Sequence, residues 1–234
     1  MSKQVSLAIV DFPGSAADEA ARALSKFPVL DVQVVGDPSE LGKFDALLLP
    51  PGASYGDYLR PGAIAATDPL AAAVKGFAKS GGHVLGIGNG FQILTELGLL
   101  PGVLLENEDG RFASGDAELE VVSPIPGFDV GDRLRLPFAH RYGRYWCNRA
   151  SLHAMEDQVQ VLLKYTDNPN GSLSGVAAVS NWEGNVVGMM PQPTRALDPA
   201  VGGTDGIAVF DALVRACKPG ARLQTSTKEQ QING

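Results

Sequence analysis

The 234-residue chain is poor in the residues that build disulfide frameworks and metal centres. It has two cysteines, Cys147 and Cys217, and three histidines. Two cysteines are too few for a disulfide scaffold or a zinc cluster, so the expectation is two reduced thiols in a cytosolic chain. We therefore expect no metal site.

Clustered positive charge and long apolar runs are also missing. The 26 acidic residues outnumber the 19 lysines and arginines, and the formal net charge is −7. Because phosphate groups are bound by clustered Lys and Arg, this composition argues against a nucleic-acid or acidic-membrane partner. No stretch approaches the length of a membrane span, and the N-terminus has neither the basic region nor the cleavage site of a secretory signal. A cytoplasmic protein is the expectation.

What the sequence does have is a regular alternation of apolar strands and helices. Val5 to Val10 is an almost wholly apolar run, typical of a strand covered on both faces, and Ser15 to Asp18 resembles a helix start. This alternation continues through the first hundred residues and predicts an α/β fold with a doubly wound, mostly parallel sheet. Further strands are predicted at 29–35, 45–49 and 83–87, with helices at 69–79 and 91–97.

After Pro101 the pattern changes to alternating strand-like segments, so mixed strands are expected in the second half. These segments are 117–122, 133–138, 159–165 and a hairpin-like pair at 175–180 and 185–190. A last helix is predicted from Thr204 to about Ala216. We expect one domain over residues 1–217 and a mobile tail over 218–234, which is rich in Gln, Ser, Thr and Lys.

The stretch HVLGIGNGFQIL, residues 83–94, places three alternating glycines between a predicted strand and a predicted helix. The glycine spacing does not complete a dinucleotide-binding fingerprint, so no nicotinamide, flavin or other cofactor is expected. Flanking glycines also form the strained elbow that presents a nucleophile at the rim of a sheet. The residue presented here is Gly88, which has no side chain. Close packing of helix on strand is the alternative role for the glycines.

Ligands of open parallel sheets bind at the carboxyl ends of the strands, where three loops are predicted here. Their sequences, together with other motifs in the same order, resemble the glutaminase subunit of phosphoribosylformylglycinamidine synthase, a class I (triad) glutamine amidotransferase. The motifs are FPGS at Phe12, SYGDYLRPGAIA at Ser54, NGFQILTELGLLPG at Asn89, NPNGS at Asn168, GNVVGMMP at Gly184 and GGTDG at Gly202.

The resemblance extends from about Val5 to Ala216 and implies a flavodoxin-like fold. It also implies a role in delivering ammonia from glutamine to a larger, ATP-dependent synthetase subunit, or to a paralogue of that subunit, with a small third subunit as a further partner.

The three positions of the family's catalytic triad depart from its pattern. The family's nucleophilic cysteine is replaced by Gly88, and its histidine and glutamate are replaced by Gln192 and Thr194. A hydrogen atom cannot attack an amide, a glutamine amide has no useful basicity near neutral pH, and threonine supplies no negative charge to steady an imidazolium. The resemblance with these departures predicts a degenerate active site without ordinary glutaminase activity.

The residues expected around the oxyanion hole are also changed. Pro51 replaces a glycine of the family's Pro-Gly-Gly and has no N–H to donate. Gly52 and the backbone of Asn89 are the remaining oxyanion-hole candidates.

The pocket expected for glutamine contains Gln92 and the segment His140-Arg141-Tyr142-Gly143, where the family has His-Gly-Glu-Gly. Arg141 and Tyr142 are bulkier than the residues they replace. This indicates either a blocked or repurposed pocket, or drift of a face that is no longer used.

Three functions remain open at this point. The leading hypothesis is a non-hydrolytic subunit that keeps the fold and the docking surface of the family. The second is an active amidotransferase, using Cys147 with His140 as a displaced nucleophile and base, or trapped by a single mutation at Gly88; one mutation would not explain Gln192 and Thr194. The third is a binding module with a regulatory ligand near Gly88, Arg141 and Gln192.

Overall fold

The computed structural model describes residues 4–200 and 202–218. Its strands are β1 (Val5–Val10), β2 (Leu30–Val35), β3 (Ala46–Leu49), β4 (His83–Ile87), β5 (Val103–Leu105), β6 (Ala113–Val121), β7 (Arg133–His140), β8 (Arg144–Trp146), β9 (Val161–Tyr165), β10 (Val176–Ser180) and β11 (Val186–Met189). Its α-helices are α1 (Ala17–Leu24), α2 (Pro69–Lys79), α3 (Asn89–Glu96), α4 (Arg149–Asp157) and α5 (Asp205–Ala216). Short 3-10 helices include η2 (Ser54–Asp57) and η5 (Pro193–Arg195).

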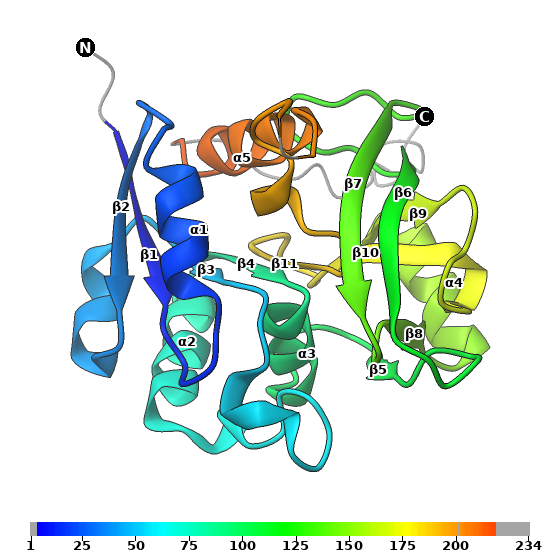
Figure 1. The fold of residues 1–234 in the computed structure, drawn as a ribbon, viewed down its shortest axis with the longest axis horizontal. Coiled ribbons are helices and arrows are strands. Elements are labelled where there is room, and N and C mark those ends of the chain that lie inside the picture. Colours follow the sequence, from blue (N-terminus) through cyan, green and yellow to red (C-terminus); the bar gives the residue numbers. More distant parts are fainter. Residues whose placement is uncertain (1–3, 201, 219–234) are drawn as a thin grey trace, which may run out of the picture.

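The main sheet has the strand order β2-β1-β3-β4-β11-β10-β9-β6-β7, and β5 pairs with β8 in a separate ribbon (Figure 1). The first five strands in this order are parallel, so their carboxyl ends meet at one edge of the sheet. The remaining neighbours pair antiparallel. The predicted α/β fold, with a mostly parallel first half and mixed strands in the second, is confirmed.

Helices cover both faces of the sheet, and each face has its own hydrophobic cluster. Along β1, Ala8 and Val10 belong to the cluster under α2, α3 and α4, whereas Leu7 and Ile9 belong to the cluster under α1 and α5. This division explains the continuous apolar run of the first strand, because both of its faces are removed from water.

The predicted bounds of β1, β4 and α2 agree with the structure, and α3 begins two residues earlier than predicted, at Asn89. Helix α4 and the β5-β8 ribbon were not predicted from the sequence. Helix α4 buries only Leu152 and Met155 along its nine residues, so its apolar pattern is too short to separate it from a polar loop.

The division into one domain over 1–217 and a mobile tail stays a prediction, and residues 219–234 of the proposed tail lie outside the described residues. Over residues 4–200 and 202–218, no helix has both the length and the apolar character needed to cross a membrane.

Candidate functional site

The sharp turn between β4 and α3 is centred on Gly88, which has φ 55° and ψ −108°. Its N–H donates to the carbonyl of Met189 at 2.8 Å, and its own carbonyl accepts from the Gln92 N–H at 3.1 Å. Side chains rarely adopt this backbone region because the Cβ clashes with neighbouring backbone atoms. Gly88 therefore has the backbone geometry of an elbow, without a side chain to present.

The sequence offers two roles for the three alternating glycines: close packing of helix on strand, and the turn of an elbow. Different glycines serve each role. A Cβ at Gly90 would overlap the carbonyl oxygen of Leu49, and one at Gly86 would lie 2.8 Å from the backbone of Gly90. These two glycines permit close packing of α3 on the sheet. A Cβ at Gly88 would meet nothing closer than the Cβ of Pro51 at 3.4 Å. Gly88 is thus required for its backbone conformation, and the space beside it fits a Cβ in ordinary van der Waals contact.

Gln192 lies next to that space. Its Nε2 would be 3.8 Å from a Cβ at Gly88. The Gln192 N–H donates to the Pro137 carbonyl at 2.8 Å, and Nε2 donates to the Ala139 carbonyl at 3.3 Å, so this residue covers the free edge of β7. The side-chain carbonyl Oε1 is buried and has no hydrogen-bond partner within the described part of the chain. A buried acceptor of this kind costs stability unless something donates to it.

Thr194 is buried one turn further on, in η5. Its neighbour Arg195 makes a two-point ion pair with Glu19 of α1, at 2.9 and 3.2 Å. The structure therefore brings Gly88 and Gln192 together and anchors the Thr194 segment against α1.

The oxyanion-hole candidates lie on the loop after β3 and at the start of α3. The Gly52 N–H donates to no acceptor among the described residues. The Asn89 N–H is the first in α3, where no intrahelical acceptor exists. Pro51 places its side chain against Gly88 and its carbonyl on the Ala16 N–H at 2.8 Å.

The side chain of Asn89 connects the start of α3 to the loop after β3. Its Oδ1 accepts from the Ser54 N–H at 2.9 Å, and its Nδ2 donates to Gln92 Oε1 at 2.9 Å and to Asp57 at 3.3 Å. Gln92 in turn donates to the carbonyl of Tyr142 at 2.7 Å. Both amide side chains are buried. The hydrogen bonds of Gln92 therefore connect α3 to the loop between β7 and β8. Asp57 was not identified from the sequence; burial raises the pKa of its carboxyl.

His140 is held in a second buried network, by two asparagines. Its Nδ1 lies 3.2 Å from Asn107 Oδ1, and its Nε2 lies 3.4 Å from Asn170 Nδ2. The amide oxygen must accept and the amide nitrogen must donate, so these contacts specify a neutral ring with the proton on Nδ1. Burial lowers the pKa of His140 to about 4. Asn107 was missed from the sequence, whereas Asn170 belongs to the NPNGS motif.

The His140 contacts predict a pH dependence of stability. The pKa of the imidazole is about 6.5 in the unfolded chain and about 4 in the folded protein. Because the pKa is depressed in the folded state, the neutral His140 ring contributes fully to the free energy of unfolding above pH 6.5. This contribution of about 2–3 kcal/mol is lost as the pH falls toward 4. His140→Gln should therefore weaken the fall in unfolding free energy between pH 6.5 and 4, measured by urea denaturation. An unchanged pH slope would contradict the neutral buried ring.

Cys147 does not meet the requirements of the displaced nucleophile considered from the sequence. It is buried, burial raises the pKa of its thiol, and its hydrogen-bond neighbour is Tyr145. Both ring nitrogens of His140 are already engaged with asparagines, so no base is available to it there. Burial also raises the pKa of Cys217, to about 12. A displaced thiolate is therefore not supported, since reactive cysteines are accessible and have a lowered pKa.

Arg141 was expected to crowd the pocket or to pair with a ligand, and both roles stay predictions. Its Nε donates to Glu106 at 2.8 Å in an exposed ion pair. Tyr142 is half-buried and contributes its backbone carbonyl to Gln92. Within the described ranges, no cluster of three or more His, Cys, Asp or Glu side chains could hold a metal ion.

Known proteins are similar to this chain in sequence over most of its length. The family model of the CobB/CobQ-like glutamine amidotransferase domain matches residues 4–202. The chain is 44% identical over 218 residues to the phosphoribosylformylglycinamidine synthase subunit PurQ of Parasynechococcus marenigrum, covering 90% of this chain and 100% of that protein. It is 45% identical over 222 residues to the same subunit of Aquifex aeolicus, covering 88% and 98%.

Solved structures agree with this likeness. A chain of PurLQS from Thermotoga maritima matches with a TM-score of 0.84 and 38% identity, covering 92% of this chain and 100% of that chain. A glutamine amidotransferase from Thermotoga maritima shares the fold, with a TM-score of 0.53 and 16% identity over 82% of this chain and 77% of that chain.

Proposed function

The chain belongs to the CobB/CobQ-like glutamine amidotransferase family, among the glutaminase subunits of phosphoribosylformylglycinamidine synthase, and on this premise we propose that it is a non-hydrolytic member of that family. In this role it is a structural or activating partner of an ATP-dependent synthetase subunit. That synthetase uses free ammonia or another nitrogen source.

The proximity of Gly88 and Gln192, two of the three triad positions, carries the proposal. The elbow geometry is retained, yet neither residue supplies a nucleophile or a base. The buried Thr194 provides no carboxylate. Loss of a complete triad typically costs about a million-fold in turnover, or about 8 kcal/mol of transition-state stabilisation. The remaining N–H donors at Gly52 and Asn89 do not replace that amount.

A preformed loop at the same edge supports docking to a partner. In the loop after β3, Tyr58 and Leu59 are 74% and 86% exposed. Leu59 has φ 69°, a conformation that costs roughly 1–3 kcal/mol and persists only where surrounding contacts impose it. Arg60 supplies such a contact through two hydrogen bonds to Glu96 of α3, at 2.6 and 2.5 Å. An ordered, exposed apolar tip loses little entropy on binding.

The name of the Thermotoga maritima structure, PurLQS, supports a partner of the PurL type and a third subunit for this chain as well. The test is co-purification with the synthetase subunit from the organism that encodes this chain. The ammonia-dependent rate of that synthetase subunit is then measured with and without this chain. We expect association, and loss of association with Leu59→Asp. Val130→Asp, at a 62% exposed apolar residue between β6 and β7, is the matched control. No association and no effect on rate would reject the proposal.

A second candidate function, the binding module, is favoured by the unpartnered Oε1 of Gln192. This buried acceptor belongs to the residue whose Nε2 would lie 3.8 Å from a Cβ at Gly88, and a ligand N–H or O–H would satisfy it. Thermal-shift measurements with glutamine, glutamate and purine nucleotides test the idea, since a ligand at a hundred times its Kd stabilises by about 2.7 kcal/mol. We expect any response to be lost in Gln192→Leu. A flat response across the panel would remove this candidate.

A further inference from the structure

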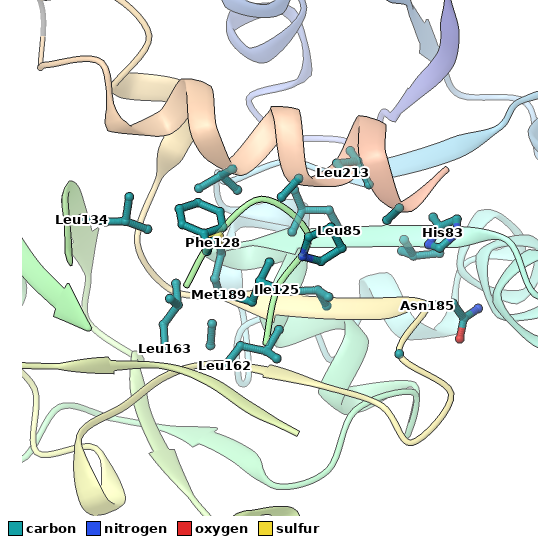
Figure 2. Close-up of a pocket in the computed structure, with 18 residues that line it drawn as sticks. His83, Leu85, Ile125, Phe128, Leu134, Leu162, Leu163, Asn185, Met189 and Leu213 are labelled. Atoms are coloured by element: carbon teal, nitrogen blue, oxygen red, sulfur yellow. The ribbon is translucent and has the colours of Figure 1, made fainter. Parts of the chain in front are cut away.

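A cavity of about 80 Å³ lies between the sheet and α5 (Figure 2). Strands β4, β9, β10 and β11 line one side, and α5 lines the other. The connection between β6 and β7 closes it with Phe128 and Ile125. Native interiors are packed at the density of organic crystals and leave few voids larger than a water molecule, so a space of this size requires an explanation.

The walls of the cavity are almost wholly apolar. Leu85, Leu163 and Met189 face it from the sheet, and each is at most 4% exposed. The polar side chains at its end are those of His83 and Asn185 (Figure 2).

Both polar side chains already have partners. The imidazole of His83 donates to the backbone of Ala216. Asn185 donates to the carbonyls of Ala78 and Gly82, both at 2.8 Å, and accepts from Asn181.

Water gains little in such a space. A buried water needs two to four polar partners, and apolar cavities without them stay dry and bind molecules such as benzene or xenon. The buried side-chain atoms that lack partners in the described ranges belong to Ser54, Tyr165 and Gln192, which do not line this cavity. We propose that the cavity is a binding site for a compact, uncharged, apolar ligand. The proposal is independent of the function assigned above.

The site has an entrance and a connection to the elbow. Phe128 and Leu213 are only half-buried, so the cavity reaches the surface between the β6–β7 connection and α5. Met189 lines the cavity, and its carbonyl accepts the N–H of Gly88. A bound ligand therefore contacts β4, which ends one residue before Gly88, and β11, which ends three residues before Gln192.

Crystals of the full chain under xenon pressure locate the site directly. We expect a xenon peak bounded by Leu85, Met189 and Phe128. Absence of a peak at this position, or water bound there instead, would overturn the proposal.

A thermal-shift measurement with benzene tests the site in solution. At ten times its Kd, benzene should raise the melting temperature of the unaltered chain by about 3–6 °C. Ala212→Leu, which fills the cavity from α5, should lose this shift. Ala208→Leu, the same change on α5 outside the cavity lining, should keep it. An equal shift in all three proteins, or none, would contradict the proposal. If Ala212→Leu does not fold, the xenon result decides.

Discussion

Gly88→Cys alone is expected to leave glutamine hydrolysis at the level of the unaltered chain, at or below detection. The new thiol would lie beside Gln192, whose amide neither removes a proton nor stabilises a thiolate. The assay is glutamate release from glutamine, with labelling by a glutamine-analogue electrophile as a check on thiol reactivity. Hydrolysis comparable with that of a working family member would mean that the pocket is intact and that the chain is a trapped enzyme.

Restoring the whole triad should produce weak glutaminase activity in a protein that otherwise has none above detection. Gly88→Cys, Gln192→His and Thr194→Glu together supply nucleophile, base and carboxylate, and the 3.8 Å between a Cβ at 88 and the side chain at 192 suits their contact. We expect weak activity at most, because Arg141 and Tyr142 still replace the family's glycine and glutamate beside the glutamine pocket. The matched control carries Ala at position 88 with the other two substitutions, and activity equal to that control would contradict the assignment of these positions.

Adding a side chain at Gly88 should destabilise the protein. Gly88→Ala and Gly88→Cys keep φ 55° only at a cost of roughly 1–3 kcal/mol, although a Cβ meets no atom closer than 3.4 Å. Gly76→Ala is the matched control, because Gly76 lies exposed within α2 with open space at its Cβ. It should stabilise by about 0.5–1 kcal/mol. Urea denaturation measures both, and no loss of stability at Gly88 would mean that the elbow relaxes to another conformation.

The sequence predicts those features of the fold that depend on local patterns. The apolar run of β1 and the caps and composition of α2 are sufficient to place both elements, because burial on two faces and helix propensity act over neighbouring residues. Helix α4 was missed because two buried residues in nine do not define a helical face.

The contacts of the site were less predictable than its position. The strand-end loops meet as expected from a parallel sheet, but side-chain partners are set by tertiary packing. The His140 ring contacts Asn107, which is 33 residues away in the sequence, and Arg141 makes an exposed ion pair with Glu106. Gln192 donates through Nε2 to the carbonyl of Ala139 on β7, 53 residues away in the sequence, and its Oε1 has no partner among the described residues.

Whether the unaltered chain hydrolyses glutamine is measured as glutamate release by the chain purified together with its synthetase partner. We expect no glutamate above background and a synthetase reaction that proceeds with ammonia as the nitrogen source. Glutamine-dependent turnover at a rate comparable with the ammonia-dependent rate would contradict this expectation, because no residue at positions 88, 192 and 194 can carry out that hydrolysis.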